Sequence, residues 1–310
     1  MKKKLFILGL VLTVVFSAVG CSKAVDNGES SGSEGDKHKI YLITMDQMDQ
    51  HWVTVDKGAK EAVDELGNVD YQWFAPDVKD DAKQIESINN AIAGGADAIL
   101  LAANGPDAVT AALKEAEAEG IKIVYVDSPA DFPAVQTLAT NNEAAGKTAG
   151  EEMLNALKAK GIESGRIGIV SVNASTDSTI QREKGFRAAF EGTDFQILET
   201  QYGDGDAARS KDIAANYITE GAVGIFGGNE GSTVGIGNAI KEAGGEVIGV
   251  GFDKSDTILQ LIEEGYLLAT MSQNPDVMGY EGIKTAVKAL NGETIDTDFI
   301  DTGVSVIKKD

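Results

Sequence analysis

From residue 40 onward, the chain alternates short apolar runs rich in β-branched residues with longer segments whose apolar residues recur at helical spacing. Continuous apolar runs of this kind are typical of strands buried on both faces of a parallel sheet. The runs that we predict to be strands are 40–45, 98–102, 121–126, 167–172, 223–227 and 246–252. This alternation predicts an α/β fold with parallel sheets and right-handed crossovers.

The segments between the runs have helical patterns that stop at glycine. Ile85, Ile88 and Ile92 recur at helical spacing before the pair at 94–95, and the segments 114–120 and 239–245 also end on glycine. Each half of the chain holds about three strand–helix units. We therefore predict two similar sheets side by side, with the chain passing from one to the other near Thr140.

The stretch at 145–148, AGKT, resembles the end of a nucleotide-binding P-loop. The full signature needs a glycine five positions before Gly146, where this chain has Asn141, and the residues between favour a continuous helix. Thr140 and Glu143 instead have the spacing of a capping box. We predict a helix that starts here and carries Ala145, Ala149 and Met153 on one face, and no nucleotide site.

The first 20 residues have the pattern of an export signal, with three lysines at 2–4 before an apolar run at 5–16. That run is too short to span a bilayer comfortably. Cys21, the only cysteine, resembles the cysteine of the bacterial lipobox, which becomes lipid-modified and N-terminal, although Ala18 stands where that motif usually has Leu. We predict a lipid-anchored extracytoplasmic protein whose segment 21–38 is a flexible tether, because it is poor in apolar residues.

The composition restricts the partners. A formal net charge of −22 disfavours nucleic acid and anionic membrane surfaces, so we expect membrane attachment only through the lipid. The 310 residues suffice for two domains of about 120–150 residues each. We expect a monomer, and a single cysteine excludes a disulfide within it.

Polar side chains follow almost every predicted strand. They are Asp46, Asp49, His51, Asn104, Asp127, Ser128, Asn173, Asn229, Glu230 and Asp253. Any one of them is most simply a helix N-cap, but a set drawn from both halves of the chain needs another explanation. Ligands of open α/β sheets bind beyond the carboxyl ends of the strands, so this set predicts a ligand site there.

The residue types favour a neutral polyol. Carboxylates, amides and Arg182 offer hydrogen-bonding groups that match vicinal hydroxyls, and Trp52 offers an apolar face for a sugar ring. An anion would require clustered cations, and only Arg182 is a candidate, which by itself could also be a solvated helix charge. The sequence has two histidines, no G-x-S-x-G elbow and no complete dinucleotide fingerprint. We expect no enzyme activity, no cofactor and no metal site, although Asp46, Asp49 and His51 lie close together in the sequence.

Several short motifs, in this order and spacing, carry a family resemblance. They are D-x-x-W-V-x-V-x-K-G-A at 49–59, V-D-S at 126–128, T-N-N-x-x-x-G-K-x-A-G from 140, Q-R-x-K-G-F at 181–186, G-N-E at 228–230, V-G-F-D at 250–253 and A-T-x-x-Q-x-P at 269–275. Over residues 39–308 the chain resembles the monosaccharide-binding lipoproteins and periplasmic proteins of ABC importers, especially the ribose-binding group.

The resemblance implies two discontinuous domains, 39–140 with 274–301 and 141–273 with 302–310, joined by a hinge of three crossings. It also implies that one sugar binds in the cleft between them and that the domains close on it. The sugar-contacting positions fall on Asp49, His51, Trp52, Asp127, Arg182, Asn229, Asp253 and Gln273, and we add Asn104 from its strand end.

The chain departs from the ribose binders at four positions. His51 and Trp52 replace a pair of phenylalanines, Ser128 stands in place of an arginine, and Gly205 in place of a third aromatic residue. The resemblance therefore implies a monosaccharide without identifying it as ribose.

Two other functions share this fold. Effector domains of sugar-responsive repressors resemble it, but the export signal and the negative charge speak against a DNA-binding role. A sensor lipoprotein that presents its sugar to a chemoreceptor or sensor kinase, rather than to a permease, stays open as an alternative.

Overall fold

The computed structural model describes residues 37–309, so the predicted signal segment, Cys21 and most of the predicted tether lie outside the described residues. Strands and helices alternate along the described part. Up to the first passage between sheets the elements are β1 (His38–Ile43), α1 (Gln50–Leu66), β2 (Val69–Phe74), α2 (Asp81–Ala93), β3 (Ala98–Leu101), α3 (Thr110–Ala118), β4 (Lys122–Val126) and β5 (Thr137–Ala139).

The next group starts with a long helix. It comprises α4 (Asn142–Ala159), β6 (Ser164–Ser171), α5 (Asp177–Ala188), β7 (Asp194–Ile197), β8 (Gln201–Tyr202), α6 (Ala207–Thr219), β9 (Ala222–Gly227), α7 (Glu230–Glu242), β10 (Ile248–Phe252), α8 (Asp256–Glu263) and β11 (Ala269–Gln273). The last elements are α9 (Pro275–Leu290), β12 (Phe299–Asp301) and β13 (Val304–Lys308).

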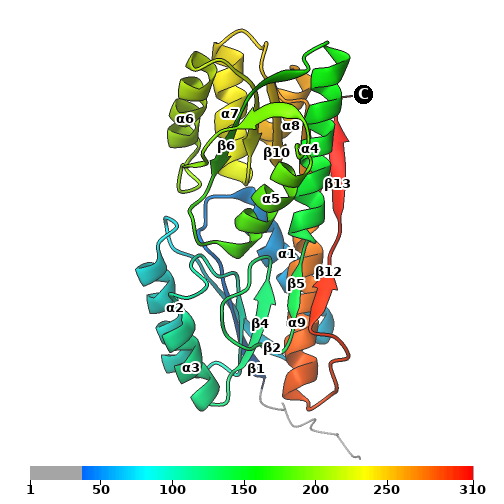
Figure 1. The fold of residues 1–310 in the computed structure, drawn as a ribbon. Helices are drawn as coiled ribbons and strands as arrows, with labels where there is room; N and C mark the ends of the chain where they lie inside the picture. The colour runs from blue at the N-terminus through cyan, green and yellow to red at the C-terminus, as the bar shows by residue number, and fades with distance from the viewer. Residues whose placement is uncertain (1–36, 310) are drawn as a thin grey trace, which may run out of the picture. The chain divides into compact units, whose positions relative to one another are not determined.

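The strands form two sheets, which confirms the predicted fold class. The first sheet has the order β12-β5-β4-β3-β1-β2 and is parallel throughout. The second has the order β13-β11-β10-β9-β6-β7, with β13 antiparallel to β11. The chain passes between the sheets after β5, after β11 and after β12, as Figure 1 shows.

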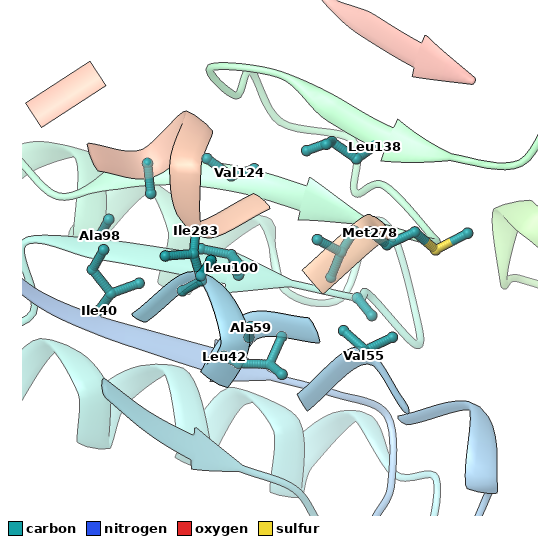
Figure 2. Close-up of a cluster of buried hydrophobic side chains, with 14 of the residues drawn as sticks. Ile40, Leu42, Val55, Ala59, Ala98, Leu100, Val124, Leu138, Met278 and Ile283 are labelled. Atoms are coloured by element: carbon teal, nitrogen blue, oxygen red, sulfur yellow. The ribbon is translucent and has the colours of Figure 1, made fainter. Parts of the chain in front are cut away.

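Each sheet is covered by helices on both faces, because successive strand residues point to opposite sides. In β1, Ile40 and Leu42 pack in one core with residues of α1 and α9, whereas Tyr41 and Ile43 pack in another with residues of α2 and α3. Figure 2 shows the first of these cores. The second sheet is likewise packed between α4 and α5 on one face and α6, α7 and α8 on the other (Figure 1).

The AGKT stretch lies inside α4, where its glycine serves packing. A Cβ on Gly146 would lie 2.0 Å from the backbone oxygen of Arg182, so only glycine allows α4 and α5 to approach this closely. Ala145, Ala149 and Met153 are buried on one face, as predicted.

The predicted capping box is wrong. The N-cap of α4 is Asn141, whose side chain accepts a hydrogen bond from the amide of Ala144 at 3.2 Å. Thr140 instead donates its hydroxyl proton to Gln273 Oε1 at 2.8 Å, and Glu143 accepts from Lys184 at 2.7 Å. The hydroxyl of Thr140 therefore forms a hydrogen bond that joins two of the crossing segments.

The predicted strands correspond to β1, β3, β4, β6, β9 and β10, with small shifts at their ends. β1 starts at His38, which we had placed in the tether, and ends at Ile43 rather than at residue 45. The other strands were not predicted; β2, for example, is an edge strand of mixed burial. Among residues 37–309, no helix has the length and apolar character needed to cross a bilayer.

Candidate functional site

A cavity lies between the carboxyl ends of the two sheets; we call it the central cavity. Eight of the nine predicted site residues line it: Asp49, His51, Trp52, Asp127, Arg182, Asn229, Asp253 and Gln273. The other lining residues are Met45, Lys79, Val172, Thr176, Ser178 and Thr179. The polar side chains at the ends of strands from both sheets therefore converge, as the sequence predicted.

Asn104 is the one predicted site residue that does not line the central cavity. Its side chain donates to Asp81 Oδ1 at 2.5 Å and accepts from Asn173 Nδ2 at 3.4 Å, and its backbone oxygen accepts from the Thr176 hydroxyl at 2.6 Å. Asn173 and Thr176 follow β6 of the second sheet. The geometry therefore gives Asn104 contacts between the two sheet regions rather than a place at the cavity.

Asp127 and Asp253 occupy equivalent positions, directly after β4 and β10, and both are strained. Their φ angles are 63° and 73°, in the left-handed region that residues other than glycine adopt in only a few per cent of cases, Asp and Asn more often than most. Among residues 37–309 only one other non-glycine residue, Asp204, has a positive φ. Local strain of this kind persists where surrounding structure enforces it, and it is common at ligand sites. The N-cap of the next helix, α8, is Ser255, so Asp253 is not that helix's cap.

His51 lies between these two carboxylates. Its Nε2 is 3.1 Å from Asp127 Oδ2, and its Nδ1 is 3.5 Å from Asp253 Oδ1. The Nε2 contact lies outside hydrogen-bond geometry, so we treat it as an ion pair. Burial alone would lower the pKa of His51, but the carboxylates of Asp127 and Asp253 outweigh it and raise the pKa above its usual value. Burial would likewise raise the pKa of Asp127, but His51 and Arg182 hold it below the usual range.

Arg182 is held by three contacts and keeps one nitrogen free. Its Nε donates to Asn142 Oδ1 at 2.8 Å, its Nη1 donates to the backbone oxygen of Gly228 at 3.0 Å, and its guanidinium lies 4.4 Å from the ring centroid of Phe252. Its Nη2 is 3.6 Å from Asp127 Oδ2 and forms no hydrogen bond with any described residue. The side chain is thus fixed in place with one donor facing the cavity lining.

Other buried donors around the cavity are also unpaired. Asn229 caps α7 through Oδ1, which accepts from the amide of Ser232 at 3.2 Å, while its Nδ2 has no partner within residues 37–309. Trp52 Nε1 is equally unpaired in the described part of the chain. Buried polar groups are almost always hydrogen-bonded, so these donors on Trp52, Arg182 and Asn229 are available to a ligand that supplies acceptors.

Lys79 is the charged lining residue that the sequence analysis missed. It follows β2, its side chain is 7% exposed, and its ammonium pairs with Asp46 Oδ2 and, at 2.9 Å, with Asp49 Oδ2. Burial would lower the pKa of Lys79, but Asp49 and Asp46 raise it, so the ammonium stays charged. Burial raises the pKa of Asp49, whereas Lys79 holds that of Asp46 below its usual value in spite of burial. A lysine in a loop between two aspartates gave no signal in the sequence.

The acidic and basic side chains that line the central cavity are equal in number. Its lining holds three carboxylates (Asp49, Asp127 and Asp253) and three basic side chains (His51, Lys79 and Arg182). With His51 protonated, the formal charges sum to zero. The lining residues by themselves therefore leave no net charge for a ligand to compensate. Within residues 37–309, no cluster of three or more His, Cys, Asp or Glu side chains has the arrangement of a metal site.

Glu230 does not line the central cavity but contacts His51, which does. Its Oε2 accepts from the backbone amide of His51 at 3.1 Å, which joins the first residue of α7 to the start of α1. Burial, together with the charges of Asp49 and Asp253, raises the pKa of Glu230 to about 7. Its protonation state therefore changes near neutral pH.

The comparisons with known proteins are consistent with one another. The family described as periplasmic binding protein domain matches residues 40–294. The chain is 31% identical to the ribose import binding protein of Haemophilus influenzae, over 92% of this chain and 95% of that protein. It is 25% identical to a D-ribose/D-allose-binding protein of Pseudomonas aeruginosa, over 92% of both chains.

Solved structures give the same result. An ABC transporter solute-binding protein of Agrobacterium vitis with bound D-fucose is similar with a TM-score of 0.83 and 31% identity, covering 87% of this chain and 95% of that one. A carbohydrate transporter solute-binding protein of Agrobacterium radiobacter in complex with D-arabinose has a TM-score of 0.84 and 30% identity, covering 88% and 95%. Both of these structures were solved with a monosaccharide.

Proposed function

Because the chain belongs to the periplasmic binding protein family, we propose that it captures one neutral monosaccharide in the central cavity and delivers it to an ABC importer. The observation that carries this proposal is the set of unpaired buried donors on Trp52, Arg182 and Asn229, three residues that line the central cavity. Sugar hydroxyls can accept from these donors and donate to the carboxylates of Asp127 and Asp253.

Ribose is not the only sugar that fits the proposal. The similar proteins named above bear the names of ribose and allose or were solved with fucose and arabinose. His51, Trp52 and Gly205 line or adjoin the site here, where the ribose binders are expected to have aromatic residues. We therefore propose a pentose or hexose whose identity is set by these departures.

We also propose that the site forms by closure of two domains, 39–140 with 274–301 and 141–273 with 302–310. Contacts that join the two sheet regions support it: His51 with Asp253, Arg182 with Asp127, and Thr176 with Asn104. Opening at the three crossings would break all of them and expose the cavity to solvent, after which the sugar would leave.

The export signal and Cys21 lead us to propose a lipid-anchored extracytoplasmic protein, tethered through the segment 21–38. Replacing Cys21 with Ala should release the protein from the membrane fraction. Unchanged fractionation would contradict the anchor. We further propose a monomer that acts without a cofactor and is not an enzyme, because the named relatives are binding proteins.

The function is tested by thermal-shift and calorimetric titration of the mature protein with pentoses, hexoses, amino acids and phosphates. A sugar ligand should bind one-to-one and stabilise the fold by about 2.7 kcal/mol at a hundredfold excess over its Kd. A response to amino acids or phosphates without a response to any sugar would contradict the proposal.

A further inference from the structure

A second hollow, which we call the outer groove, lies beside the central cavity and has an empty volume of about 1060 Å³. It is lined by residues of both sheet regions, among them Met48, Val78, Asp204 and Gly205. Asp49 and Lys79 line the outer groove and the central cavity alike. This pair is therefore the wall between the two spaces.

The wall is fixed from both sides. On the first-sheet side, the Lys79 ammonium is bound by Asp46 and Asp49, and Asp46 Oδ1 is itself fixed by accepting from the amide of Asp49 at 3.0 Å. On the other side stands Gly205, which has no side chain. A Cβ built on Gly205 would lie 2.7 Å from Lys79 Nζ and 2.9 Å from its Cε. The glycine thus leaves the space that the lysine side chain fills.

The wall also keeps hydrogen-bonding capacity. A lysine ammonium has three N–H groups, and among the described residues it donates to two acceptors, Asp46 and Asp49. Asp49 is the N-cap residue of α1 but makes no side-chain cap bond within the described chain, so its second carboxylate oxygen is also available. The wall therefore keeps one N–H donor on Lys79 and one carboxylate oxygen on Asp49 without a partner among the described residues.

We propose that the Lys79–Asp49 wall determines ligand specificity: it limits the cavity to one sugar ring and binds one particular hydroxyl of that sugar. This inference rests on the proposed monosaccharide function. The Lys79–Asp49 wall selects ligands that carry a hydroxyl group next to it. It rejects ligands that have a hydrogen or a methyl group there, because a buried charged pair that faces an apolar group loses its solvation without a replacement.

The test uses two glycine substitutions at positions with the same φ. Gly205 and Gly292 both have a φ of 74°, in the left-handed region where Ala is strained at either position. Gly205→Ala must also displace Lys79, whereas a Cβ at position 292 meets no described heavy atom within 4 Å. Lys79→Gln is the second wall variant, because it removes the charge without adding atoms. Melting temperatures without sugar show that each variant is folded.

The probes are D-ribose, D-allose, D-arabinose, D-fucose, D-galactose and D-glucose, followed by the monodeoxy analogues of whichever binds the wild type most tightly. In the wild type and in Gly292→Ala, loss of the hydroxyl at the wall should weaken binding by about tenfold or more. In Gly205→Ala and Lys79→Gln, loss of the hydroxyl at the wall should no longer weaken binding. Loss of any other hydroxyl should weaken binding as much as it does in the wild type.

Two results would overturn the inference, and they differ. If the wild type binds no sugar at all, the proposed function fails and the inference fails with it. If the wild type binds a sugar but every deoxy penalty is the same in the wall variants as in Gly292→Ala, the function stands and Lys79 does not determine specificity. Should Gly205→Ala fail to fold, the Lys79→Gln titration alone decides between these results.

Discussion

The two sides of the central cavity hold their polar groups in different ways. On the first-sheet side, the basic side chains of Lys79 and His51 pair with the carboxylates of Asp49 and Asp127. On the second-sheet side, Arg182 and Asn229 are fixed by a helix start and by backbone or amide oxygens, and each keeps a free donor. The first side thus shapes and closes the space, and the second side presents rigid donors to what enters it. Rigid donors lose little entropy on binding, so we expect the larger share of affinity from the second side.

The largest effect should come from removing the most connected second-side residue, by Arg182→Ala. The change leaves Asp127 without its guanidinium neighbour and the Gly228 carbonyl without its donor, both in buried surroundings. Loss of one partner of a buried pair typically costs about 3–5 kcal/mol, so urea unfolding should show a loss of that order along with loss of sugar binding. Arg187→Ala on the same helix is the control, since Arg187 is partly exposed and pairs with Glu183 near the surface. Equal losses in the two variants would contradict the distinction.

A pH effect should arise where the two sides meet, at Glu230 and His51. The folded state raises the pKa of Glu230 from 4.5 to about 7, so the unfolded chain releases this proton first and stability falls as pH rises between those values. A shift of this size corresponds to at most about 3 kcal/mol. His51 also has a raised pKa, so its contribution is complete below about 6.5 and is lost as pH rises through the folded value.

Glu230→Gln isolates the carboxylate's part of this effect. Glutamine can still accept from the His51 amide but does not titrate. Unfolding free energies measured from pH 4 to 8 should therefore decline less in the variant than in the wild type between pH 4.5 and 7. Parallel profiles would show that Glu230 ionises normally in the folded protein.

A somewhat smaller effect is expected from Asp253→Ala. Asp253 accepts from Gln273 Nε2 at 2.5 Å and lies 3.5 Å from His51, so its removal leaves polar groups unpaired at the cavity. The expected loss of sugar affinity is roughly 1.5–3 kcal/mol, about tenfold to a hundredfold by calorimetry. Ser255→Ala is the matched control, because Ser255 is the actual cap of α8 and should cost about 1 kcal/mol of stability with affinity unchanged. If Asp253→Ala lowers the stability but leaves the sugar affinity unchanged, as expected for Ser255→Ala, then Asp253 does not bind the sugar.

The smallest effect should follow Asn104→Ala. Its side chain contacts Asp81 and Asn173 outside the cavity, so we expect stability to fall by about 1 kcal/mol and sugar affinity to change by only a few-fold. A hundredfold loss of affinity with normal stability would restore Asn104 as a ligand-binding residue, as the sequence had suggested, and would show that the first side holds the ligand more strongly than we propose.

The sequence pattern predicted the fold class, and together with the family resemblance it predicted eight of the residues that line the central cavity. Interior strands such as β3 and β10 are continuous apolar runs, because both of their faces are buried. The side chain that follows such a strand lies at the carboxyl edge of the sheet whatever the details of packing, which is why Asp127 and Asp253 could be placed. β11 was not predicted because its buried residues include Thr270, Ser272 and Gln273, which give no apolar run.

Tertiary structure decided the contacts between segments far apart in the chain. Lys79 became a wall residue only because Gly205, 126 positions later, leaves room for its side chain. Asn141 rather than Thr140 caps α4, because the Thr140 hydroxyl donates to Gln273 on another crossing segment. Asn104 does not line the cavity, and its side chain is hydrogen-bonded to Asp81 and Asn173 instead. Local sequence fixes periodicity and strand ends, since these depend on neighbouring residues, but the partner of a polar side chain depends on which distant segment the packing places beside it.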